Sequence, residues 1–256
     1  MGRFAYVIGR YSSRHKLIIK NLKLAFPELN DAERKRIAKK MWWHMGALLI
    51  EYLTVDKIVS GNNIIVENGH ILDRVASENA PHIFFTAHIG NFELLPILAK
   101  QYNVDISVLF RPPNNKYVAD MIYKIRSRYV TNLIASKHGA AIKLNEVLQD
   151  NGSVGVLVDQ KFRSGVDTIF FNHPIKTNPI SIKLAKKYNC DIYPAQCLRI
   201  GVGKYKVILY DKMELIENED GSVDIQESCQ KLNDIVEGWV RKNPEQWMWF
   251  HNRWDL

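Results

Sequence analysis

From residue 81 onward, short apolar runs alternate with stretches of helical pattern. We expect strands at residues 83–87, 105–110, 133–135, 153–158, 168–171, 191–198 and 205–210, and helices at about 92–101, 120–129, 140–149, 179–188 and 225–242. Strands that alternate with helices in this way are typical of a mostly parallel sheet with helices on both faces. The sequence therefore predicts an α/β fold in three layers.

The first 60 residues have a different character and are expected to form a helical arm. Asn30 and Glu33 have the spacing of a capping box, so we expect a helix to begin there and to run to about residue 53. A second helix is expected at residues 69–78. We therefore divide the chain into an N-terminal arm at residues 1–60 and an α/β catalytic domain at residues 61–256.

The net charge of +8 lies at one end of the chain. Residues 1–40 hold eleven Lys or Arg against three acids, so the remaining residues carry no net charge. A basic arm can bind nucleic acid or an anionic membrane, or can be a solvated charged face. Bulky apolar residues are interleaved with the cations, which suits a helix in the plane of a membrane interface. We therefore expect an anionic membrane surface as the partner and no nucleic acid.

No segment is expected to cross a bilayer. The longest apolar stretch, residues 41–53, is interrupted by His44 and Glu51 and is shorter than the ~20 residues that a spanning helix needs. No signal peptide is expected, because the start lacks a continuous apolar stretch before its charges. The three cysteines have no paired spacing, which fits a reducing compartment and predicts neither disulfide nor zinc site.

His88 and Glu93 are the leading candidates for the chemistry. The strand expected at 83–87 stops at His88, and a helical pattern begins just before Glu93. Open α/β sheets place their ligands at the carboxyl ends of strands. A loop histidine can meet a carboxylate in the first turn of the next helix, and an imidazole held by a carboxylate is a general base. A histidine and a glutamate five residues apart also occur by chance, so the pair alone leaves a purely structural role open.

Two further polar clusters follow predicted strands. Arg111 comes after the strand at 105–110, and Asp159, Gln160 and Lys161 come after the strand at 153–158, with Arg163 close by. In a parallel sheet these clusters open onto the same edge as His88, which favours a functional site. The sequence contains no GxSxG, GxxxxGK[ST] or HExxH motif, so the residues indicate an enzyme with a His/carboxylate base but name no substrate.

Five ordered motifs resemble the lipid A late acyltransferases of the lysophospholipid acyltransferase superfamily. They are HIGNFELL (88–95), LFRPPNN (109–115), VLVDQK (156–161), FFNHPIKT (170–177) and PEQWMWFHNRW (244–254). The segment at residues 14–34 resembles the region that precedes the catalytic domain of these enzymes. The residue five positions after His88 is Glu, as in the lipid A branch of the superfamily, whereas the glycerolipid branch usually has Asp there.

The resemblance implies transfer of a fatty acyl chain from acyl carrier protein to a hydroxyl of a lipid A precursor, at the cytoplasmic face of the inner membrane. It implies that His88 removes the hydroxyl proton, that Glu93 orients the imidazole, and that there is no acyl-enzyme, no metal and no cofactor. Arg111 is expected to stabilise an oxyanion or to bind an acceptor phosphate. The other residues expected to shape the site are Asn91, Asp159, Gln160, Lys161 and Arg163.

Two other functions remain open at the level of the sequence. An acyltransferase of glycerophospholipids or other glycolipids would share His88 and Glu93 and differ in its acceptor. A non-enzymatic basic protein that binds a membrane or nucleic acid would bind in a salt-sensitive way that does not depend on His88.

Overall fold

The computed structural model describes residues 2–110, 115–130, 132–135 and 139–255. The described strands of the main sheet have the order β1-β9-β8-β2-β5-β3-β4. Their bounds are β1 (Ile64–Glu67), β2 (His82–Thr86), β3 (Ile106–Phe110), β4 (Leu133–Ala135), β5 (Ser153–Leu157), β8 (Asp191–Gly201) and β9 (Lys204–Leu209). All neighbouring pairs are parallel except β8 with β9, which form an antiparallel hairpin.

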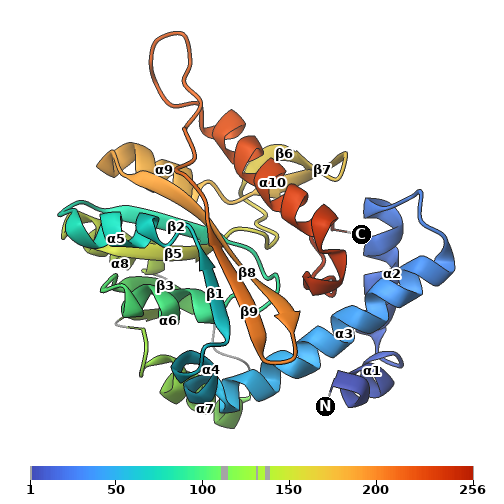
Figure 1. The fold of residues 1–256 in the computed structure, drawn as a ribbon. Coiled ribbons are helices and arrows are strands. Elements are labelled where there is room, and N and C mark those ends of the chain that lie inside the picture. Colours follow the sequence, from blue (N-terminus) through green and yellow to red (C-terminus); the bar gives the residue numbers. More distant parts are fainter. Residues whose placement is uncertain (1, 111–114, 131, 136–138, 256) are drawn as a thin grey trace.

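Helices cover both faces of this sheet (Figure 1). Their bounds are α1 (Gly2–Gly9), α2 (Ser13–Ala25), α3 (Asp31–Leu53), α4 (Val55–Ser60), α5 (His70–Ser77), α6 (Leu94–Gln101), α7 (Lys116–Arg126), α8 (Ala140–Gln149), α9 (Ile180–Tyr188), α10 (Ile225–Lys242) and the 3-10 helix η1 (Pro244–Gln246). One hydrophobic cluster joins α2, α3, α8, α9 and α10 to one face, and a second joins α4, α5 and α6 to the other. The predicted three-layer α/β fold with a mostly parallel sheet is confirmed.

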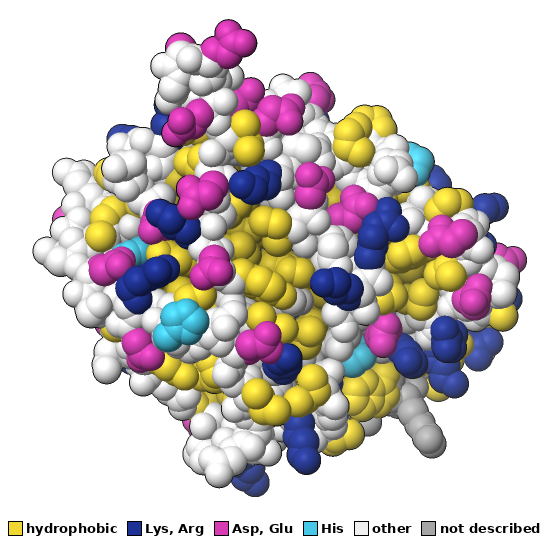
Figure 2. All heavy atoms as spheres, turned by 45° about the horizontal axis from the view of Figure 1, so that its top comes forward, with side chains coloured by type: hydrophobic (Ala, Val, Ile, Leu, Met, Phe, Trp, Pro, Cys, Tyr) yellow, Lys and Arg dark blue, Asp and Glu magenta, His cyan; other side chains and the backbone are white. Residues whose placement is uncertain are grey.

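The apolar side of the N-terminal arm is part of the core. Ile18, Leu22, Ile37 and Met41 are buried in the same cluster as Phe85 of β2. The Lys and Arg side chains of α2 and α3 lie at the surface except that of Arg34, which is 6% exposed and donates to the backbone oxygens of Phe26 and Pro27. Figure 2 shows dark-blue Lys and Arg side chains grouped on the side where Figure 1 places α2 and α3. Within the described residues, no helix combines the length and the apolarity that are needed to cross a membrane.

Residues 166–177 form a hairpin where the sequence analysis expected a single strand at 168–171. β6 (Val166–Phe170) pairs with β7 (His173–Thr177), and the two connecting residues, Phe171 and Asn172, have φ of 52° and 59°. A two-residue loop with positive φ at both positions matches the right-handed twist of the paired strands. Asn adopts positive φ more readily than most residues, but Phe rarely does. A turn at Phe171 and Asn172 was therefore not predicted from the sequence.

Candidate functional site

Parallel pairing of β2 with β5 places His88 beside Asp159. In the register of the two strands Thr86 is opposite Leu157, and each polar residue follows two positions later. The carboxyl ends of parallel strands meet at the same edge of the sheet, so both side chains emerge there. The sheet itself thus brings together two residues that are 71 positions apart.

The carboxylate of Asp159 fixes the imidazole of His88. Its Oδ1 lies 2.8 Å from Nδ1 of His88, and its Oδ2 accepts from the backbone N–H of His88 at 2.9 Å and from Nε1 of Trp247 at 2.7 Å. A carboxylate can only accept, so Nδ1 carries the proton and Nε2 keeps its lone pair. The side-chain amide of Gln160 lies 3.2 Å from this Nε2. The histidine is therefore held in the tautomer of a general base.

The two side chains shift each other's pKa in opposite directions. Burial lowers the pKa of His88, but attraction and hydrogen bonding to Asp159, with a smaller contribution from Glu93, outweigh burial and raise this pKa above its ordinary value. Burial raises the pKa of Asp159, but His88 and Trp247 outweigh that effect and the pKa is lowered. Asp159 therefore stays ionised, and His88 is a stronger base than a free histidine.

In the part of the chain that the structure describes, the carboxylate at the imidazole of His88 is that of Asp159, and Glu93 contacts a different residue. Glu93 immediately precedes α6, and its carboxylate binds the guanidinium of Arg126 in α7 through two contacts, one of them an Nε to Oε2 distance of 2.8 Å. Arg126 also donates to the hydroxyl of Tyr52 at 3.1 Å. Arg126 lies 33 positions after Glu93, so the five-residue spacing from His88 gave no sign of it. Glu93 acts on His88 through its charge, at longer range.

The remaining predicted site residues differ in their distance from the imidazole. Gln160 lies at the imidazole, and the backbone N–H of Lys161 donates to Nε2 of His251 at 2.9 Å. Asn91 is buried three positions after His88, and Arg163 is exposed beside a second cavity. Arg111 lies outside the described residues. Among the described residues, no three His, Cys, Asp or Glu side chains are grouped so that they could hold a metal ion.

A buried ion pair fixes the loop that follows His88. Arg199 of β8 donates from Nε to Oε1 of Glu51 at 2.9 Å and contacts the other carboxylate oxygen at 2.5 Å, and its side chain is only 1% exposed. Oε2 of Glu51 also accepts from the amide of Asn91 at 2.9 Å. Nη1 of Arg199 donates to Nδ1 of His44 at 2.7 Å. Burial and Arg199 lower the pKa of His44 to about 4, so this histidine is neutral and can accept.

The sequence analysis missed Glu51 and Arg199 as site residues. They are 148 positions apart, and the sequence contains no pattern that pairs a glutamate of a long helix with an arginine of a strand. The buried glutamate inside the apolar stretch 41–53 was the available signal, because a buried carboxylate requires a partner. Trp247, which donates to Asp159, belongs to the aromatic terminus that the sequence analysis had quoted as a motif.

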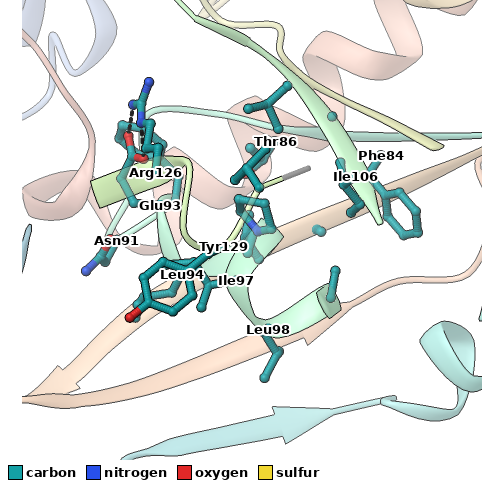
Figure 3. A pocket seen from close by; sticks show the side chains of 18 of the residues that line it. Phe84, Thr86, Asn91, Glu93, Leu94, Ile97, Leu98, Ile106, Arg126 and Tyr129 are labelled. Carbon is teal, nitrogen blue, oxygen red and sulfur yellow. Dashed lines mark hydrogen bonds and ion pairs between the residues drawn. The ribbon is translucent and has the colours of Figure 1, made fainter. Parts of the chain in front are cut away.

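An apolar cavity begins beside this loop (Figure 3). Glu93 and Arg126 lie at one end of it, and Phe84 and Ile106 lie at the other. Leu94, Ile97 and Leu98 of α6 form one wall, and Thr86 of β2 forms part of another. The cavity has a volume of about 100 Å³. His88 does not line it directly, but the ring of Phe92, which does, lies 4.9 Å from the imidazole between ring centroids. The cavity therefore offers a mostly apolar lining next to the loop that carries His88.

Comparisons with known proteins identify the family of the chain. Residues 1–255 match the family described as bacterial lipid A biosynthesis acyltransferase. A lipid A biosynthesis acyltransferase of Haemophilus influenzae is similar to the chain, with 22% identity over 258 residues that cover 97% of this chain and 78% of the relative. The resemblance indicated by the five motifs is thereby confirmed. The chain belongs to the family of bacterial lipid A biosynthesis acyltransferases.

Proposed function

We propose that this acyltransferase moves a fatty acyl group from the thioester of acyl carrier protein to a hydroxyl of a lipid A precursor, with His88 as general base. Family membership supports the acyl transfer and the lipid A precursor. The observation that carries the mechanism is the imidazole of His88, whose Nδ1 is held 2.8 Å from the buried carboxylate of Asp159 and whose Nε2 faces the exposed Gln160.

The proposed reaction has one addition step and one elimination step. Nε2 of His88 takes the proton of the acceptor hydroxyl while the oxygen forms a bond to the thioester carbonyl carbon. The carbon–sulfur bond then breaks, and the imidazolium returns the proton to the departing thiolate. Asp159 holds the imidazole and stabilises its charged form, and the negative charge of Glu93 adds to this stabilisation. Arg111 is proposed to stabilise the oxyanion.

The apolar cavity is proposed to hold the acyl chain of the donor. It ends near the imidazole at Phe92, so a chain in the cavity would present its carbonyl carbon to the acceptor hydroxyl. The basic arm is proposed to hold the enzyme on the cytoplasmic face of the inner membrane, where a lipid acceptor is available. The transfer is proposed to be direct, without an acyl-enzyme.

A product assay tests this proposal. The purified chain is incubated with an acyl carrier protein thioester and a lipid A precursor, and mass spectrometry is expected to find the precursor heavier by one acyl group. Incubation with the thioester alone should leave the intact mass of the protein unchanged. His88→Ala should lose activity by roughly 10²- to 10⁴-fold, as expected for a general base. The exposed His70 provides the matched control, and His70→Ala should keep wild-type turnover.

Two results would contradict the proposal. Near-normal turnover of the His88→Ala protein would exclude the general base. Acylation of a glycerophospholipid in place of the lipid A precursor would exclude the proposed acceptor.

A further inference from the structure

A second cavity lies on the Gln160 side of the imidazole, between the β6–β7 hairpin and the C-terminal segment. Its volume is about 350 Å³. The residues that line it are Lys161, Phe162, Arg163, Asp167, Pro174, Ile175, Lys176, Arg253, Trp254 and Asp255. Unlike the first cavity, this one has a wall made largely of charged side chains.

The wall carries more positive than negative charge. Four of the lining residues are Lys or Arg and two are Asp. The two carboxylates lie at the rim: Asp167, with a side chain 78% exposed, pairs with Lys176 at 2.8 Å, and Asp255, with a side chain 68% exposed, pairs with Lys161. Exposed pairs of this kind are weak, because water competes with the carboxylate. An anion with several acceptor oxygens can therefore replace them.

Arg253 supplies the strongest reason to expect an anion. This residue is 2% exposed, and among the described residues its guanidinium donates to uncharged acceptors only, namely the backbone oxygens of Gln160 and Lys176, the hydroxyl of Thr177 and the amide oxygen of Asn233. Its Nε has no hydrogen-bond partner among the described residues. Burial lowers the pKa of Arg253 to about 10, and Asp159 offsets this only in part. A buried cation without a carboxylate in contact is costly, so a bound anion would stabilise it.

Gln160 connects this cavity to the imidazole of His88. Its backbone oxygen accepts from Arg253 at 2.6 Å, and its side-chain amide lies 3.2 Å from Nε2 of His88. Lys161, the next residue, lines the cavity. Gln160 therefore lies between an anion bound in this cavity and Nε2 of His88, the atom that is proposed to take the acceptor proton.

We propose that this cavity is a phosphate subsite for the acceptor, formed by Lys161, Arg163, Lys176 and Arg253. The inference rests on the proposed function and adds to it the acceptor group that is recognised. A phosphate offers several acceptor oxygens to Lys and Arg donors, and such charge-assisted hydrogen bonds are the strong ones. Binding of the phosphate holds the sugar, and with it the attacking hydroxyl, at the His88 side of the enzyme.

Equilibrium binding of two glycolipids tests the subsite without relying on turnover. The probes are a phosphorylated lipid A precursor and the same glycolipid after enzymatic removal of its phosphates, both in detergent micelles and titrated into the full chain. The variants are Lys161→Met and Lys176→Met. Their side chains are 20% and 47% exposed, so neither substitution opens the core. Lys206→Met is the matched control, because Lys206 pairs with Glu67 on β1, away from this cavity.

The wild-type chain is expected to bind the phosphorylated glycolipid more tightly than its dephosphorylated form. Each cavity variant should weaken binding of the phosphorylated probe by roughly tenfold or more, which corresponds to the loss of one charge-assisted hydrogen bond. Binding of the dephosphorylated probe should stay the same, and Lys206→Met should bind both probes like the wild type.

Equal weakening for both probes, or no weakening for either, would overturn the subsite. A third result would also overturn the subsite. If the cavity variants lose binding to vesicles of phosphatidylglycerol but keep their affinity for the phosphorylated glycolipid in micelles, the anion bound in the cavity is a membrane headgroup. Failure of the proposed function has a different signature, because the wild-type chain would then transfer no acyl group even though the binding difference between the two probes is present.

Discussion

Nδ1 of His88 lies 2.8 Å from Oδ1 of Asp159, and this contact is set by the register of two neighbouring strands. The same carboxylate also accepts from the backbone N–H of His88 and from the indole of Trp247. Three donors therefore hold one buried carboxylate, and the carboxylate in turn holds the ring. Because β2 and β5 are neighbouring strands in the middle of the sheet, the orientation of the imidazole is set by strands that are paired on both sides.

Asp159→Asn should impair catalysis and shift its pH dependence. The amide carries no charge and can stabilise the wrong tautomer, so kcat should fall on the order of 10³- to 10⁴-fold. A general base must be neutral, so in the wild type kcat/KM should fall as the pH drops through a pKa above the ordinary 6.5 of histidine. Without the carboxylate the main influence that raises this pKa is gone, and the acid limb should move to lower pH. Profiles of kcat/KM against pH measure both effects.

Asp150→Asn is the control for this substitution, because Asp150 is exposed at the end of α8. It should leave the profile in place. An acid limb in the Asp159→Asn protein at the wild-type pH, with kcat reduced, would show that Asp159 does not set the pKa of the base.

Much of the fold and one half of the site follow from local sequence patterns. The apolar strands stop at His88 and at Asp159, and parallel pairing then places both residues at one edge without further information. The capping box at Asn30 and the helix Ile225–Lys242 appear where the sequence predicts them, since both depend on residues close in the chain. The sequence predicts Asp159 as a residue that shapes the site, but it does not predict the hydrogen bond between Asp159 and His88.

The other half of the site depends on contacts between distant segments. The partner of Glu93 is Arg126 in α7, and the partner of Glu51 is Arg199 in β8, and no spacing rule links these positions. Salt-bridge partners are set by how helices cross the sheet, which is decided by packing of the whole core. The short spacing between His88 and Glu93 therefore gave no sign that His88 contacts Asp159 and that Glu93 contacts Arg126.

Breaking the Glu51–Arg199 pair should destabilise the fold and disturb the His88 loop. Both Glu51→Gln and Arg199→Met leave a buried charge without its partner, so each should cost about 3–5 kcal/mol in the free energy of unfolding. The double substitution Glu51→Gln with Arg199→Met should cost clearly less than the sum, because the second change removes the orphaned charge. Urea unfolding of the four proteins gives this coupling.

The more exposed pair Lys206–Glu67 is the reference for this measurement, with side chains 36% and 47% exposed. Its coupling should be within about 1 kcal/mol. If the two pairs have equal coupling energies, the buried network does not hold the loop in the way that its geometry indicates.

Filling the far end of the apolar cavity should shorten the preferred acyl chain. Ile106 lines the end opposite Glu93 and Arg126, and Ile106→Trp would replace a small side chain by a large one at that point. With acyl carrier thioesters of increasing length, kcat/KM should fall for the longer chains and change little for the shorter ones. Ile65 is exposed on β1 and does not line the cavity, so Ile65→Trp should leave the length profile unchanged. A uniform loss over all chain lengths would place the acyl chain elsewhere.

The carboxyl-terminal half of α3 should contact the membrane. Leu49 and Leu53 are one helical turn apart and 63% and 67% exposed, while Leu48 and Tyr52 beside them line the apolar cavity. Bilayer contact at this point would bring lipid close to the cavity, and burial of each leucine contributes roughly 1.5–3 kcal/mol. Leu49→Asp with Leu53→Asp should therefore weaken binding to vesicles of phosphatidylethanolamine and phosphatidylglycerol by at least about tenfold in a sedimentation assay. Ile142→Asp alters an equally exposed residue, 64%, on α8, and should bind like the wild type. Equal losses in the two proteins would mean that a general change of charge, and not this surface of α3, governs the binding.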